Sequence, residues 1–84
     1  MYTVEDMLRI EDRGLQSLLV EIDIPTLATA LVGTTADLQA KVRRNMSSRA
    51  QATLSEEIGL QGNVSSTKIT DARKIIVTAM RKLE

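Results

Sequence analysis

The sequence predicts an all-α fold, a compact bundle of about six short helices. Apolar residues recur at helical spacing along nearly the whole chain, and no segment alternates as a strand does. Aromatic residues make up 1% of the chain, so the core must consist of aliphatic side chains and methionine, which favours helices packed on helices. A length of 84 residues is that of one small domain, and we expect residues 1–84 to form a single helical unit.

The first three helices are expected to be short. Apolar residues that mark the first are Val4, Met7 and Leu8. We expect this helix to end near the E-D-R-G stretch at residues 11–14. The apolar stripe of the second helix consists of Leu15, Leu18, Leu19 and Ile22. Pro25 suits the first turn of a third helix, because its missing N–H has no partner there, and Gly33 is a suitable terminator. The inner face of the third helix consists of Leu27, Ala30 and Leu31.

Thr35 can cap a fourth helix, and either Ser47 or Ser48 can cap a fifth. The inward residues of the fourth helix are expected to be Leu38, Val42 and Met46. Its C-terminal end carries cations, which the helix dipole favours there, at Lys41, Arg43 and Arg44. Gly59 and Gly62 are stop signals for the fifth helix, which we place at residues 47–60.

The last helix, residues 67–83, has the strongest periodic signal in the chain. Its cap is expected at Ser65, Ser66 or Thr67. Its apolar stripe, widened on one flank, consists of Ile69, Ala72, Ile75, Ile76, Met80 and Leu83. Such a wide apolar face is expected to belong to the core rather than to a partner-binding strip.

The composition excludes several classes of function. Eleven basic and eleven acidic residues give a net charge of zero, whereas nucleic-acid binders carry a basic excess. The chain has no cysteine and no histidine, so we expect no disulfide, no metal site and no cofactor. Apolar stretches are far shorter than the ~20 residues that span a bilayer, and no secretory signal is visible. We therefore expect a cytoplasmic chain that does not insert into the membrane.

The stretch "RRNMSSRAQATLSEEIGL", residues 43–60, places its charges against the helix dipole. Ala50, Leu54 and Ile58 form the expected inward stripe of this helix. At ~100° per residue, Arg49 and Glu56 fall within ~20° of each other on nearly the opposite side. A cation near the start and an anion near the end are each disfavoured by a few tenths to ~1 kcal/mol. Either these are ordinary solvated surface charges, or they are placed for a partner that carries complementary charges.

Several segments of the chain resemble the C-terminal domain of the flagellar motor switch protein FliG. They are "EDMLRIEDRGLQSLLVEID", "LATALVG", "LQAKVRRNMSSRA" and "DARKIIVTAMRKL", and the match runs in register across nearly all 84 residues. The resemblance implies the six-helix fold of that family and a place on the rotor, in the cytoplasm at the inner-membrane basal body. It also implies roles in motility and chemotaxis.

In that family the domain meets the cytoplasmic loop of the stator protein MotA through charged residues on one helix, the torque helix. The resemblance places the basic residue of the N-M-S-x-R-A motif at Arg49 and the acidic pair near the helix end at Glu56 and Glu57. The family's basic residue of the A-L-K-G turn falls on Val32, and that of the G-P-V-R turn falls on Ser65, so both of these charges are lost.

Two further departures concern a hinge and a turn. The family's Met-Phe-x-Phe hinge falls on the lead-in at residues 1–4, which reads Met1, Tyr2, Thr3, Val4. The family's G-P turn is Gly62-Asn63. The segments by which FliG binds the membrane ring, other switch proteins and neighbouring FliG subunits lie mostly outside this chain. We expect either a fragment of a longer protein or a truncated paralogue.

Two functions remain open from the sequence. The first is a non-enzymatic rotor domain that contacts MotA through Arg49, Glu56 and Glu57 to generate torque. The alternative is a divergent scaffold or interaction domain of the same fold, whose torque face has degenerated through the changes at Val32 and Ser65. An enzyme is not expected, because no nucleophile and base stand at a suitable spacing and adjacent glutamates on a helix point ~100° apart.

Overall fold

The computed structural model describes residues 3–83. The elements are a 3-10 helix and five α-helices, with the bounds η1 Val4–Arg9, α1 Asp12–Glu21, α2 Ile24–Ala30, α3 Ala36–Arg44, α4 Ser48–Leu60 and α5 Ser66–Lys82. No strand occurs in this part of the chain. The predicted all-α fold of about six helices is confirmed, and the first of them is a 3-10 helix.

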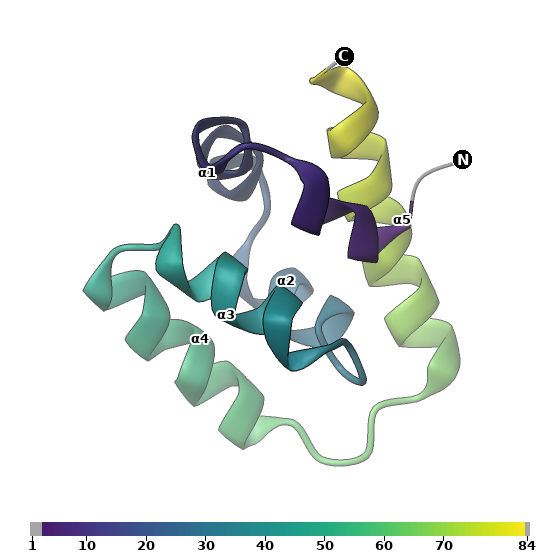
Figure 1. Cartoon of the computed structure of the whole chain (residues 1–84). Helices are drawn as coiled ribbons and strands as arrows, with labels where there is room; N and C mark the ends of the chain where they lie inside the picture. Colours follow the sequence, from purple (N-terminus) through teal and green to yellow (C-terminus); the bar gives the residue numbers. More distant parts are fainter. Residues whose placement is uncertain (1–2, 84) are drawn as a thin grey trace.

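The short helix α2 lies at the centre of the bundle and packs against both α4 and α5, which flank it (Figure 1). The 3-10 helix η1 packs against α3 and α5, and α1 packs against α5. Leu27, Ala28 and Ala30 of α2 are all buried. The two alanines have small side chains, so neighbouring helices can approach the α2 backbone closely.

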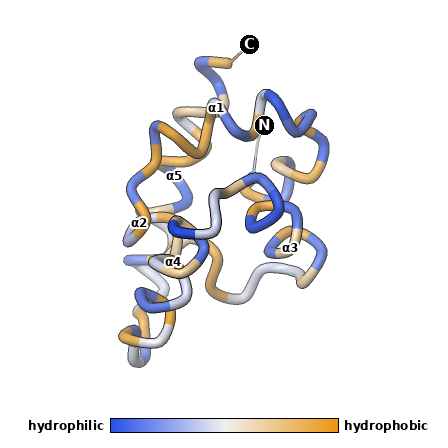
Figure 2. The backbone as a smooth tube through the Cα atoms, turned by 90° about the vertical axis from the view of Figure 1, so that its left-hand side faces the viewer, coloured by the Kyte–Doolittle hydropathy of each residue, from blue (hydrophilic) through white to orange (hydrophobic). Residues whose placement is uncertain are grey.

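The core consists only of apolar side chains among residues 3–83. Apolar positions recur along each helix (Figure 2), and the buried ones form one core cluster. On α5 the predicted inward positions Ala72, Ile76 and Met80 are buried, but Ile75 is 53% and Leu83 43% exposed. The buried stripe of α5 is therefore narrower than predicted, because Ile75 lies outside it. Ala79, which was not among the predicted inward residues, is buried and belongs to the stripe.

Hydroxyl caps fix the starts of three helices. Thr35 Oγ1 accepts a hydrogen bond from the Leu38 N–H at 3.2 Å, as predicted. Ser47 is the cap of α4, with its Oγ 3.1 Å from the Ala50 nitrogen. Ser65 is the cap of α5, with its Oγ 3.3 Å from the Lys68 nitrogen. For α4 and α5 the structure thus identifies the capping residue among the two or three candidates that the sequence offers.

At three helix boundaries the structure adds detail to the expected positions. The E-D-R-G stretch opens α1 instead of only ending the first helix, because Asp12 stands in the first turn, where the dipole favours an anion. Gly59 lies inside α4, which continues to Leu60 before the backbone becomes extended at Gln61. The last helix runs from Ser66 to Lys82, one residue earlier at each end than predicted.

Gly33 ends the α2–α3 turn as the sequence predicts, with a φ of 77°, a conformation that favours glycine. Of the predicted hinge, Met1 and Tyr2 lie outside the described residues. The Thr3 N–H donates to the Asp6 carboxylate at 2.8 Å, and Val4 is buried in the core. No helix between residues 3 and 83 is both long and apolar enough to cross a membrane.

Candidate protein-interaction site

The helix that carries the predicted site, α4, is only lightly buried. Of its 13 residues, Leu54 is the one that is fully buried. Ala50 is half-buried, and Ile58, predicted to point inward, is 38% exposed. Among the other helices, α4 packs mainly on α2, which has seven residues against the 13 of α4. Most of the surface of α4 is thus available to a partner.

Side-chain hydrogen bonds fix α4 along its length. Gln51 Nε2 donates to the Met46 carbonyl at 3.0 Å near the start of the helix. Arg43 on α3 donates from Nη1 to Ser55 Oγ at 3.0 Å in the middle. Just beyond the last turn, Gln61 Nε2 donates to Thr29 Oγ1 on α2 at 3.2 Å. These bonds hold the helix in one position while its outer side chains stay exposed.

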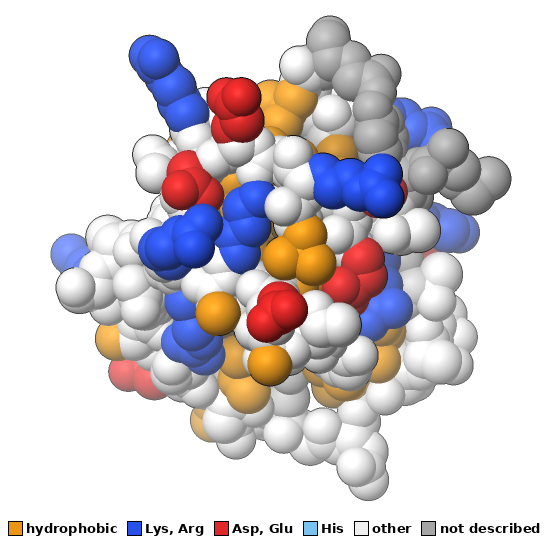
Figure 3. All heavy atoms as spheres, in the orientation of Figure 1, with side chains coloured by type: hydrophobic (Ala, Val, Ile, Leu, Met, Phe, Trp, Pro, Cys, Tyr) orange, Lys and Arg blue, Asp and Glu red, His pale blue; other side chains and the backbone are white. Residues whose placement is uncertain are grey.

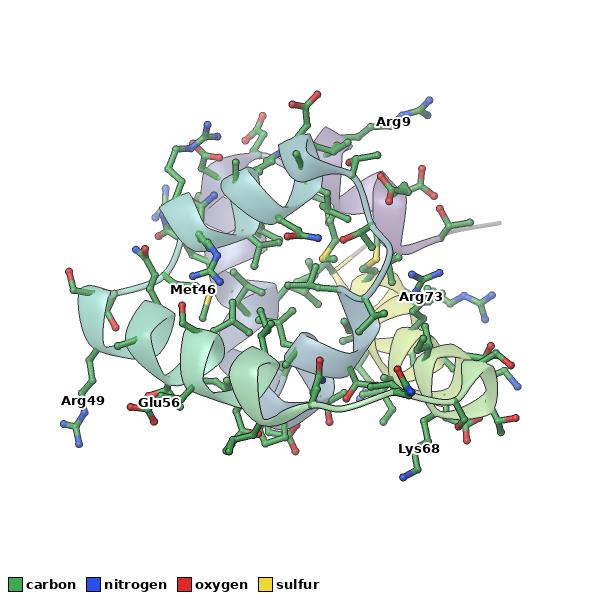
Figure 4. All side chains as sticks on the ribbon, turned by 90° about the horizontal axis from the view of Figure 1, so that it is seen from below. Arg9, Met46, Arg49, Glu56, Lys68 and Arg73 are labelled. Carbon is green, nitrogen blue, oxygen red and sulfur yellow. The ribbon has the colours of Figure 1, made fainter. Side chains whose placement is uncertain are left out.

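The predicted charges lie on the outer side of this helix. Arg49 and Glu56 are both exposed and point away from the body of the domain on the same side (Figure 4). Glu57 is half-buried on the adjoining flank. Within residues 3–83 the only ion pair joins Arg44 to Asp12, so none of these three charges is paired there. Arg49 stands in the first turn of α4, where the dipole disfavours a cation, so the charge arrangement gives the domain no local stability.

Val32, the first of the lost basic positions, lies in the turn between α2 and α3 and is half-buried. Its backbone carbonyl accepts a hydrogen bond of 2.6 Å from Arg73 Nη2 on α5. Arg73 Nε also donates to the Ala30 carbonyl at 3.1 Å. A cation at the end of α2 satisfies carbonyls that have no partner within the helix. Arg73 was not predicted from the sequence. The one feature of the sequence that could have indicated its role is its position between Ile69 and Ile76, at the edge of the apolar stripe.

Ser65, the second lost basic position, caps α5 through its hydroxyl group. This role needs a short side chain that can accept a hydrogen bond from the backbone of the same helix. The structure therefore brings Arg49 and Glu56 to one side, leaves Glu57 on their flank, and gives Val32 and Ser65 places in turns that are fixed by hydrogen bonds.

The basic residues at the end of α3 hold neighbouring elements, in addition to the predicted stabilisation of their own helix terminus. Lys41 Nζ donates to the Leu8 carbonyl at 2.8 Å and to the Ile10 carbonyl, which ties α3 to the end of η1. Arg44 Nη2 lies 2.9 Å from Asp12 Oδ1 and ties α3 to the start of α1. Basic and acidic side chains are interspersed on the face that carries η1 and α3 (Figure 3).

Asn45 completes this link between α3 and α1. Its Nδ2 donates to Asp12 Oδ1 at 3.1 Å and to the Lys41 carbonyl at 2.9 Å, and its Oδ1 accepts from Gln16 Nε2 at 3.0 Å. Hydrogen bonds from Arg44, and then from Asn45, hold the pKa of the Asp12 carboxyl below its usual range. The R-N pair before the M-S motif is therefore structural, in contrast to Arg49.

Acidic side chains show no clustering that suggests a metal centre. Within residues 3–83, no group of three or more histidine, cysteine, aspartate or glutamate side chains is placed to hold a metal ion. The Asp23 carboxylate, for example, accepts a hydrogen bond of 2.9 Å from the Thr26 N–H and so caps α2. Hydrogen bonds from the side chain and then the backbone of Thr26 lower the pKa of this carboxyl group. The candidate site is therefore a surface of charges.

The family model of the FliG C-terminal domain matches residues 1–84. The flagellar motor switch protein FliG of Thermotoga maritima is 38% identical over 84 residues, which are 100% of this chain and 25% of that protein. FliG of Borreliella burgdorferi is 36% identical over 84 residues, 100% of this chain and 24% of that protein. This chain thus spans about a quarter of the length of these relatives.

Solved structures agree with these matches. Full-length FliG from Aquifex aeolicus superimposes with a TM-score of 0.91 and 34% identity, over 99% of this chain and 26% of that one. A FliG fragment from Helicobacter pylori gives a TM-score of 0.92 and 31% identity, over 99% and 39%. The chain therefore belongs to the FliG C-terminal domain family.

Proposed function

We propose that this chain is a rotor domain of the flagellar motor switch, which transmits force through α4 to the cytoplasmic loop of the stator protein MotA. The observation that carries this proposal is the unpaired state of Arg49 and Glu56 on an exposed helix, in an order that the helix dipole disfavours. Charges that serve neither the fold nor the helix are available to a partner. We take MotA as that partner from the resemblance to FliG.

Weak charge pairs suit such a contact. An exposed pair contributes only ~0.2–1 kcal/mol, so the contact forms quickly and is released easily. A rotor must release its partner at every step. With Glu56 and Glu57 both present and Val32 uncharged, this face is more acidic than the family pattern, so the partner loop is expected to present basic side chains near the end of α4.

Rotor membership also implies partners beyond the stator. Neighbouring FliG subunits and other switch-complex proteins would bind mainly through parts of the protein outside this chain. The domain would then act without catalysis or cofactor, on the cytoplasmic side of the inner membrane at the basal body. Motility and its control by chemotaxis would depend on it.

A second candidate function is a scaffold of the same fold whose torque face has degenerated. Two exposed apolar residues at the end of α4 favour it, since Ile58 is 38% and Leu60 81% exposed. An apolar contact would then replace the charged one, and binding would persist at high salt. Val32 gives this alternative less support, because its side chain is half-buried.

A salt series with the isolated MotA loop separates the two functions. We would measure binding of the loop to the wild-type chain and to the Arg49→Glu and Glu56→Lys variants. The matched controls are Arg9→Glu and Glu21→Lys, exposed charges on other helices; Arg9 projects on the far side from Arg49 (Figure 4). The rotor function predicts binding that fades with salt and is weakened only by the two α4 variants. Salt-resistant binding that tolerates all four variants would favour the scaffold.

A further inference from the structure

Lys68 stands at the start of α5 with its charge unused by the domain. It lies in the first turn of that helix, and its backbone N–H donates to the capping Ser65. Its side chain is exposed, and no ion pair engages it within residues 3–83. The dipole disfavours a cation in a first turn, which is the same anomaly as that of Arg49 on α4.

Lys68 is connected to the region after α4 through residues of α2. Gln61, just past the last turn of α4, donates to Thr29 Oγ1 at 3.2 Å. Thr29 and Lys68 line the same open hollow between α2 and α5. The residue that follows α4 and the first turn of α5 therefore both lie beside Thr29 of α2. Lys68 points to the same side of the domain as Arg49 and Glu56 (Figure 4).

Three basic residues of the domain have structural partners, whereas Lys68 has none within residues 3–83. Lys41 and Arg73 donate to backbone carbonyls of other helices, and Arg44 pairs with Asp12. Asp71 lines the hollow together with Lys68, yet the two side chains do not form an ion pair. Lys74 of the same helix also has no ion pair, but Lys68 differs from it by standing in the first turn and by pointing to the side that carries Arg49 and Glu56 (Figure 4).

We propose that Lys68 is a further charged residue of the partner contact, which gives this face the order basic, acidic, basic at Arg49, Glu56 and Lys68. The inference rests on the proposed function and adds a specificity determinant to it. The partner loop must present an acidic side chain opposite Lys68, beyond the basic side chains that meet Glu56. Ser65 does not carry this charge because its hydroxyl caps the helix, so the charge stands one turn later.

Binding of the MotA loop to the 84-residue chain tests the inference. The variant is Lys68→Glu, and the matched control is Lys74→Glu, an exposed lysine of the same helix that lines a different hollow, with Glu21. Lys68→Glu places an anion in a first turn, where the dipole favours it, so its thermal midpoint is expected to equal or exceed that of the wild type. Loss of binding could then not be attributed to unfolding.

We expect about three- to tenfold weaker binding for Lys68→Glu at low salt, because a reversal removes one attraction and adds one repulsion. Lys74→Glu should change binding less than twofold, and changing one acidic residue of the loop to lysine should restore binding to Lys68→Glu. If Arg49→Glu weakens binding and Lys68→Glu does not, the role of Lys68 is overturned while the rotor function stands. If the wild-type chain does not bind the loop, the rotor function fails, and the role of Lys68 fails with it.

Discussion

The guanidinium group of Arg73 on α5 donates a hydrogen bond of 2.6 Å to the backbone carbonyl of Val32, which lies 41 residues earlier in the chain. A second bond of 3.1 Å reaches the Ala30 carbonyl. One side chain thus joins the longest helix to the end of the central helix α2. This link fixes the turn whose basic residue the chain has lost.

Replacing Arg73 with methionine should destabilise the domain by about 1–3 kcal/mol, because two part-buried carbonyls lose a charged donor. Arg73→Lys should recover only part of this loss, since a lysine cannot place two donors in the fixed geometry of a guanidinium group. Urea unfolding measures the difference. The matched control is Arg81→Met on the exposed side of the same helix, which should change stability by less than ~0.5 kcal/mol. Equal effects of the two variants would contradict the structural role of Arg73.

Gly33 and Gly59 should respond in opposite directions to the same substitution. Gly33 has a φ of 77° with open space around it, so Gly33→Ala should cost about 1–2 kcal/mol from backbone strain alone. Gly59 lies inside α4, and a Cβ there meets no atom within 4 Å. Gly59→Ala should therefore stabilise the domain by up to about 1 kcal/mol. Thermal unfolding of the two variants tests this pair, and a shared sign would contradict the assigned backbone conformations.

Leu54 is the anchor of α4 and should be far more sensitive than its neighbour in the predicted stripe. Leu54 is fully buried, so Leu54→Ala should cost about 2–5 kcal/mol. Ile58 is 38% exposed, and Ile58→Ala should cost less than about 1.5 kcal/mol. Denaturant unfolding measures the loss of unfolding free energy in each variant, provided that the m-value is unchanged. A larger effect at Ile58 would mean that α4 packs on its other flank.

The bond between Asp12 and Arg44 should stabilise the domain above, and not below, the ordinary pKa of a carboxyl group. The folded-state pKa of Asp12 is lowered by its hydrogen bonds from Arg44 and Asn45. A depressed pKa gives stability that is complete above the unfolded-state value of ~3.9 and is lost as the pH falls through the lower folded-state value. A double-mutant cycle of Asp12→Asn and Arg44→Met should show coupling at pH 7 and none at the acid end of that window. If the coupling persisted at low pH, it could not come from the ionised Asp12–Arg44 pair, and the prediction would be contradicted.

Particular residues show which features the sequence can predict. Hydrophobic periodicity predicts the helices, and hydroxyl residues before them predict the caps at Thr35, Ser47 and Ser65, because both signals are local. The width of a buried stripe is not local. Ile75 is exposed because it lies in open hollows between α5 and the preceding helices α1 and α2, and no pattern within α5 reveals that.

The candidate site was predictable to the same extent. The position of Arg49 and Glu56 on one side of α4 follows from helix geometry, and both side chains point to that side in the structure (Figure 4). The position of Lys68 on the same side as these two charges depends on how α5 packs against the rest of the domain, which the sequence of α5 alone does not reveal. The roles of Lys41 and Arg73 likewise depend on contacts between distant segments, so single-sequence reasoning treated Lys41 as a helix terminus charge and did not select Arg73.

The most direct test of the central claim is a paired measurement on the double variant Arg49→Glu/Glu56→Lys. The claim is that these charges serve a partner at the expense of their own helix. Reversing both aligns them with the dipole of α4, so the variant should be more stable than the wild type by a few tenths to ~1 kcal/mol. Its affinity for the MotA loop at low salt should fall at least about tenfold. A variant that is less stable, or that binds the loop as well as the wild type does, would contradict the account.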